Sequence, residues 1–178
     1  MKSVVAVIGG AHASPEVLTA AEELGRRLID AGCRIVTGGL SGVMEAACRG
    51  ARSSPAWRDG DIIGVLPGLD SSAVNPFVDI AIVTGLNHAR NVVVAATADV
   101  VVAVGGGAGT LSEMAHAWQH GKRVIGLRIG GGWSDRLAGE PLDDRRADVV
   151  QGALNAEDAV RLVVVALGGP RGAARLGF

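Results

Sequence analysis

The sequence predicts an α/β fold, a Rossmann-like, doubly wound and mostly parallel sheet of six or seven strands with helices on both faces. Short apolar runs rich in β-branched residues alternate with helix-like stretches along the chain. Within each run the hydrophobicity is continuous rather than alternating, which is typical of strands covered on both faces. Strands that alternate with helices imply parallel pairing through right-handed crossovers.

Seven apolar runs are predicted to form strands, at residues 4–8, 34–37, 62–66, 78–83, 100–104, 124–129 and 149–151. Helices are predicted at residues 15–31, 42–52, 87–98, 110–120 and 157–167. Ser14 followed by Pro15 is typical of a helix start, and Gly32 is typical of its end. We expect a long loop at residues 130–148 and a flexible tail at 171–178. Because no repeat or long linker divides the chain, residues 1–170 are expected to form a single nucleotide-binding domain.

The composition excludes several classes of protein. The net charge is -1 and aromatic residues make up 3% of the chain, so the basic surface and the stacking aromatics of a nucleic-acid-binding protein are missing. No apolar stretch approaches the ~20 residues needed to cross a bilayer, and the N-terminal apolar run is too short for a secretion signal. We therefore expect a cytoplasmic protein without a nucleic-acid or membrane partner. Cys33 and Cys48 are expected to be buried, reduced thiols.

Glycines follow the carboxyl ends of several predicted strands. In open α/β sheets, ligands bind along this edge, because the backbone there approaches them closely. Several glycine-bearing turns therefore predict one groove that takes a ligand. The turn after the first strand contributes three expected ligand contacts, which are Gly9, Gly10 and His12.

The most specific local signal lies at residues 101–118, where a strand leads into a glycine-rich turn and a helix that we expect to begin at about Thr110. Glycine allows a sharp turn and lets backbone N–H groups face an anion. The unpaired N–H groups and the positive dipole end of the helix then favour a phosphate. The alternative is a tight structural turn with no ligand. The predicted phosphate-binding residues of this turn are Gly105, Gly106, Gly107, Gly109 and Thr110.

Glu113 and two further segments are predicted to line the same groove. Glu113 follows Thr110 by three residues and lies on the same helix face. A contact with ribose hydroxyls or with a leaving group would explain a carboxylate at this position. Arg90 stands at a helix start, where a negatively charged ligand would explain it; the alternative is a solvated surface arginine. The turn after the second strand is also predicted to contact the ligand, through Gly38, Gly39, Gly42 and the adjacent Met44. The alternative is that its glycines only allow close packing of the helix on the sheet.

These segments resemble the Lonely Guy (LOG) family and its wider superfamily, once labelled lysine decarboxylases. The LOG motif PGGxGTxxE is present at residues 106–113 as GGxGTxxE, with Gly105 at the position of the proline. The family's preceding Arg-Lys pair is Arg90-Asn91 here. Residues 37–47, 66–68, 75–79 and 84–91 are similar to a bacterial branch that also resembles molybdenum-cofactor carrier proteins.

The resemblance implies one of two functions. LOG enzymes hydrolyse the N-glycosidic bond of nucleoside 5′-monophosphates, and Arg90 and Glu113 occupy the positions of their catalytic pair. The alternative is a non-catalytic carrier or sensor of a nucleotide-like ligand such as the molybdenum cofactor, and Asn91 in place of the lysine favours it; Asn91 is also an expected ligand contact. The resemblance further implies a homodimer, for which the helices at 87–98 and 110–120 are candidate contacts.

No resident cofactor or metal is expected, although a nucleotide, phosphate or molybdenum cofactor is an expected ligand. A pyridoxal-phosphate decarboxylase needs a Schiff-base lysine, and the two lysines, Lys2 and Lys122, lie at the terminus and in a predicted turn. His116 and His120 have the spacing of metal ligands but lack the glutamate of an HExxH motif. A dinucleotide-binding oxidoreductase is disfavoured, because no acidic residue follows the glycine-rich turn at the required distance.

Overall fold

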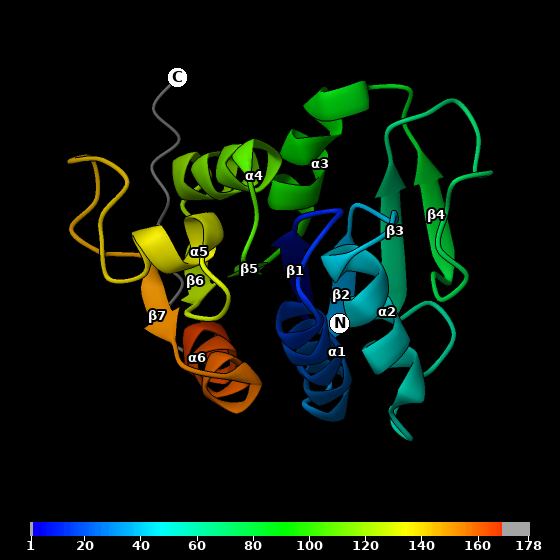
Figure 1. The fold of residues 1–178 in the computed structure, drawn as a ribbon, viewed down its shortest axis with the longest axis horizontal. Coiled ribbons are helices and arrows are strands. Elements are labelled where there is room, and N and C mark those ends of the chain that lie inside the picture. Colours follow the sequence, from blue (N-terminus) through cyan, green and yellow to red (C-terminus); the bar gives the residue numbers. More distant parts are fainter. Residues whose placement is uncertain (1, 169–178) are drawn as a thin grey trace.

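A seven-stranded sheet forms the centre of the protein in the computed structural model, which describes residues 2–168 (Figure 1). Its strands pair in parallel in the order β4-β3-β2-β1-β5-β6-β7. The predicted doubly wound fold is therefore confirmed, while the predicted tail at 171–178 lies outside the described residues. The strands are β1 (Val4–Gly9), β2 (Arg34–Thr37), β3 (Ile62–Leu66), β4 (Ile80–Val83), β5 (Val100–Val104), β6 (Arg123–Leu127) and β7 (Gln151–Ala153).

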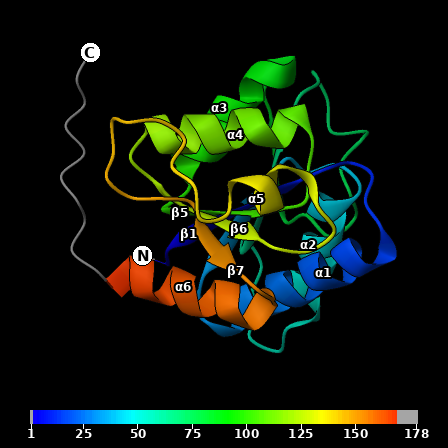
Figure 2. The same ribbon diagram turned by 60° about the vertical axis from the view of Figure 1, so that its left-hand side comes forward.

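Helices cover both faces of the sheet, as Figures 1 and 2 show. One face carries α1 (Pro15–Asp30), α2 (Val43–Ser53) and α6 (Ala156–Gly168). The other carries α3 (Arg90–Thr97), which follows the short helix η1 (Asn87–Ala89), together with α4 (Ala108–Gln119) and α5 (Gly132–Leu137). Along β1, Val5 and Val7 pack toward the first layer, and Ala6 and Ile8 toward the second. This burial on both sides explains the continuous hydrophobicity of the central strands. The edge strand β4 differs from the prediction, because all four of its residues are exposed.

Several element boundaries differ from the sequence prediction. The segment at 130–148, predicted as a loop, contains α5, and glycines with positive φ at Gly130, Gly131 and Gly132 introduce this helix. Helix α4 begins two residues earlier than predicted, because Gly107 acts as its N-cap. Strand β4 begins at Ile80 rather than at residue 78, since Asp79 is hydrogen-bonded to the first residue of β3. Its N–H donates to Ile62 O at 2.9 Å and its carboxylate accepts from Ile62 N at 3.0 Å.

The direction of chain winding reverses between β1 and β5. From β1 the chain adds β2, β3 and β4 on one side, and β5 then returns to pair with the other side of β1. Such a switch point opens a crevice at the carboxyl ends of the two strands, where ligands of doubly wound proteins bind. Gly9–Gly10 and Gly105–Gly107 lie at the ends of these two strands, so the turns that were predicted to line a groove lie at the switch point.

Two further predictions concern the burial of the cysteines and the absence of a membrane-spanning helix. Cys33 and Cys48 are both buried and free, as predicted. Within residues 2–168, no helix combines the length and the apolar character that a membrane crossing requires.

Candidate ligand-binding site

The turn between β5 and α4 presents unpaired backbone N–H groups to open space. Gly105 and Gly106 have φ values of 60° and 92°, which only glycine adopts freely. Gly107 caps α4 without a side-chain hydrogen bond, so the first N–H groups of the helix lack an intrahelical partner. A Cβ placed on Gly107 or Gly109 would meet no atom within 4 Å. This geometry is that of an anion cradle at a helix N-terminus.

Hydrogen bonds to helix α5 fix the conformation of this turn. The Gly105 N–H donates to Ser134 Oγ at 2.7 Å, and the same hydroxyl donates to Leu127 O at 2.8 Å. The N–H groups of Trp133 and Ser134 donate to the carbonyls of Gly106 and Gly105, both at 3.1 Å. The conformation of the cradle is thus fixed before any ligand arrives. Sequence reasoning missed Ser134, although the Gly130–Gly132 run after β6 was a signal of a close backbone approach.

The turns after β1 and β2 meet each other and border the cradle. Val43 N–H donates to Gly10 O at 3.0 Å, and a Cβ on Gly42 would overlap Gly10 O. A Cβ on Gly10 would lie 3.9 Å from Gly106 Cα. The predicted alternative of close packing also holds here, because Gly42 leaves no room for a side chain. Gly9 and Gly39 are likewise packed closely, against Val43 Cγ1 and Leu66 Cδ2.

Arg90 is buried, so its interpretation as a solvated surface arginine is wrong. Only 9% of the residue is exposed, and its Nη1 donates to Val65 O at 2.8 Å. A Cβ on Gly38 would overlap this guanidinium and lie 2.6 Å from Met44 Sδ. Gly38 is therefore needed to admit the arginine. Burial lowers the pKa of Arg90, and Glu113 acts against that shift.

Glu113 lies on α4, one turn after Thr110, and is also buried, with 7% exposure. Burial raises the pKa of Glu113 to about 7, and the positive charge of Arg90 partly opposes this rise. Among residues 2–168, the Glu113 carboxylate accepts no hydrogen bond and forms no direct ion pair with Arg90. An acid and a cation are thus held apart beside the cradle. Thr110 is buried against Gly106, as a Cβ on that glycine would overlap its side chain.

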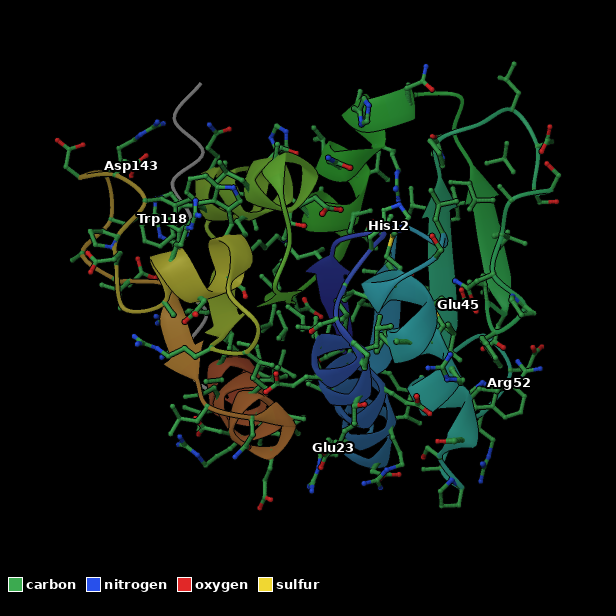
Figure 3. All side chains as sticks on the ribbon, viewed as in Figure 1. His12, Glu23, Glu45, Arg52, Trp118 and Asp143 are labelled. Carbon is green, nitrogen blue, oxygen red and sulfur yellow. The ribbon has the colours of Figure 1, made fainter. Side chains whose placement is uncertain are left out.

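Asn91 and His12 have different surroundings. Asn91 is buried, and its Nδ2 donates to Ser112 Oγ at 2.7 Å and to Gly109 O at 3.4 Å. Its amide therefore ties α3 to the first turn of α4. His12 is exposed on the loop after β1, at the same edge of the sheet (Figure 3). Within residues 2–168, no group of three or more histidine, cysteine or acidic side chains is placed to hold a metal ion.

The fold and the site together define a Rossmann-like α/β protein with a candidate anion site at its switch point. The chain belongs to the SLOG cluster4 family, whose model matches residues 2–160. Its resemblance to the LOG-like superfamily, and within it to molybdenum-cofactor carriers, is confirmed by this match and by the similar structures.

Solved structures that are similar include a molybdenum cofactor binding protein from Rippkaea orientalis, with a TM-score of 0.81 and 35% identity over 94% of this chain and 98% of that one. The molybdenum cofactor carrier protein of Chlamydomonas reinhardtii has a TM-score of 0.80 and 36% identity over 94% of this chain and 100% of that one. An uncharacterised protein of Archaeoglobus fulgidus is 39% identical over 124 residues, 70% of this chain and 79% of its own.

Proposed function

We propose that this protein binds and carries a small molecule that bears a phosphate group, with the molybdenum cofactor as the leading candidate. The observation that carries the proposal is the fixed, uncapped N-terminus of α4, whose first turn is hydrogen-bonded to Asn91, the residue next to the buried Arg90. Similarity to proteins described as molybdenum cofactor carriers supports it. The ligand is cargo here, and the cytoplasmic location stays a prediction.

In this proposal the phosphate lies on the N–H groups of the first turn of α4. The positive dipole end of the helix stabilises the phosphate charge, and the absence of Cβ atoms on Gly107 and Gly109 leaves it room. Among the residues that the structure describes, the Arg90 side chain forms one hydrogen bond, to Val65 O, so its other N–H groups remain for the ligand. A carrier needs tight binding without reaction, and a rigid preorganised cradle supplies this.

Binding is tested by equilibrium dialysis of the purified protein against cofactor released from a molybdoenzyme. We expect Arg90→Ala to weaken binding by about tenfold to a hundredfold, since a hydrogen bond to a charged group contributes about 1.5–3 kcal/mol. Glu45→Gln, on the neighbouring helix α2, is the matched control and should bind like wild type. Equal retention by the Arg90→Ala variant would contradict the proposed site.

A second candidate function is a phosphoribohydrolase that acts on nucleoside 5′-monophosphates. One observation favours it: Arg90 and Glu113 lie buried beside the same cradle, and the pKa of Glu113 is about 7. A carboxylate there would stabilise an oxocarbenium-like transition state while the phosphate is held. The Asn91 side chain disfavours it, because it is occupied by α4 instead of reaching into the groove.

The two functions are separated by incubation with AMP and other nucleoside monophosphates, with free base followed by chromatography. A carrier should bind these ligands or the cofactor and release no base. Base release that disappears in Glu113→Gln and Arg90→Ala, but not in Glu45→Gln, would replace the carrier by the hydrolase. Release that persists in Glu113→Gln would remove the role of this glutamate.

We also propose a homodimer, in which β4 and α3 take part. Exposed apolar side chains gather on the edge strand and on the segment that leads into α3; they are Ile80, Ile82, Val83, Leu86 and Val92. Clusters of this kind mark protein interfaces. Among the described residues, α4 exposes no large apolar side chain to the same extent, so α3 is favoured over α4 as the contact.

A further inference from the structure

Glu113 lies on α4 close to the cradle, and its charge, when it is ionised, opposes the proposed ligand. It lies one turn into α4, on the same face as Thr110, whose N–H belongs to the first turn. It is more than nine-tenths buried and accepts no hydrogen bond from any residue between 2 and 168. An ionised carboxylate in such a place lacks the partners that buried charges require.

A phosphate bound at the same helix end makes ionisation less favourable still. A second negative charge nearby favours the protonated form of a carboxyl group. The protonated form also changes the chemistry of the site, because its O–H is a hydrogen-bond donor. Neutral Glu113 can therefore donate to an oxygen of the ligand, where its ionised form can only repel it.

Resting on the proposed function, we propose that Glu113 takes up a proton when the anionic ligand binds and gives it up when the ligand leaves. Glu113 then acts as a proton-linked latch: the ligand is held by a neutral acid and the cationic Arg90, and a rise in pH weakens the hold. The same residue would distinguish a phosphate-bearing ligand from a neutral analogue, whose binding needs no proton.

The elements around Glu113 contribute few other charged groups that could produce the same pH dependence of binding. Arg90 from α3 is the charged group that acts on its pKa. Helix α4 carries His116 one turn further on, and α5 carries Asp135 and Arg136. Two exposed histidines, His12 and His88, lie on the segments after β1 and before α3. The strands β1 and β5 beneath α4 contribute apolar side chains.

In the ligand-free protein the pKa of Glu113 is about 7, and this value sets the pH range in which binding is linked to proton uptake. Below this value the acid is already protonated, so binding consumes few protons. Above it, and up to the higher pKa of the complex, each ligand bound takes up one proton. Affinity should then fall by about tenfold for each pH unit. The slope is expected between pH 7 and 9.

The probe is sulfate, which stays a dianion from pH 6 to 9, so that any pH dependence belongs to the protein. Calorimetric titration at pH 7, 8 and 9 gives the affinities, and repeating each titration in two buffers of different ionisation enthalpy counts the protons taken up. Wild type and Glu45→Gln should show the slope and an uptake approaching one proton at pH 8. Glu113→Gln, an isosteric and permanently neutral variant, should bind with a flat profile and no uptake.

The outcomes separate this inference from the proposed function. Sulfate binding with no uptake in wild type, or the same slope in Glu113→Gln, would overturn the latch and leave the anion site standing. A failure of sulfate to bind at every pH would overturn both. Because proton counting uses wild type alone, the test does not depend on how well the variant folds.

Discussion

Asn91 Nδ2 donates a hydrogen bond to Ser112 Oγ at 2.7 Å, and this bond joins the two helices that form the ligand site. Asn91 directly follows Arg90 at the start of α3, and Ser112 lies in the first turns of α4, beside the cradle. The Ser112 hydroxyl in turn donates a hydrogen bond to Gly109 O at 2.8 Å. The position of the buried arginine relative to the cradle is therefore set by the residue next to it.

Removing this link should weaken ligand binding more than it weakens the fold. In Asn91→Ala the Ser112 hydroxyl loses a partner, and we expect phosphate affinity to fall by about three- to tenfold. Isothermal titration with inorganic phosphate measures the change. Gln119→Ala, at the exposed end of the same helix α4, should leave the affinity unchanged. If the two variants bind alike, the link does not position the site.

Two neighbouring glycines in the cradle should respond differently to alanine. At Gly106 the φ of 92° and the overlap of a Cβ with Thr110 predict a loss of stability of about 1–3 kcal/mol. At Gly107 the φ is -106° and a Cβ meets nothing, so Gly107→Ala should fold normally but project a methyl group into the cradle. Urea unfolding and phosphate titration together separate the two effects. Normal phosphate binding by Gly107→Ala would show that the anion lies elsewhere.

Ser134 supports the cradle from α5, and its loss should affect both stability and binding. In Ser134→Ala the buried Gly105 N–H and Leu127 carbonyl both lose a partner, which predicts about 1–3 kcal/mol of destabilisation. Because Gly105 begins the turn, phosphate affinity should also fall. Ser53→Ala, whose hydroxyl bonds Gly50 O near the exposed end of α2, is the control and should change little. Full affinity in Ser134→Ala would mean that α5 does not shape the cradle.

The sequence was sufficient to predict the fold, and the glycine-rich turns of the candidate site were found in the same way, because both depend on local patterns. The buried run of β5 and the glycines after it can be read without knowing any contact. What the sequence could not reveal are contacts between distant segments. The burial of Arg90 depends on the space left by Gly38, and the role of Asn91 depends on Ser112, 21 positions away. Helix α5 was not predicted, because three consecutive glycines suggest a loop. In the structure their positive φ values bring the start of this helix against the backbone of Gly105.

The proposed dimer can be tested on its apolar edge. Strand β4 has one unpaired side and carries neither a lysine nor a proline to prevent pairing. Ile82→Glu should therefore give a stable monomer by sedimentation velocity at micromolar concentration, where wild type sediments as a dimer. Val164→Glu, on the exposed side of α6, is the matched control: its residue is 52% exposed, against 40% for Ile82, and it should remain dimeric. A monomeric wild type would refute the dimer itself.

The burial of Glu113 predicts how stability depends on pH in the absence of ligand. Its pKa rises from 4.5 to about 7 on folding, so the folded protein binds more protons than the unfolded chain between these values. The contribution of Glu113 to stability is therefore fully present below pH 4.5 and is lost as the pH rises through 7, a difference of about 3 kcal/mol. Glu113→Gln cannot ionise, so it should be more stable than wild type at pH 8 and closer to it at pH 5. Urea unfolding of both proteins at the two pH values measures this difference, and an equal gap at pH 5 and pH 8 would show that Glu113 ionises as readily in the folded protein as in the unfolded chain.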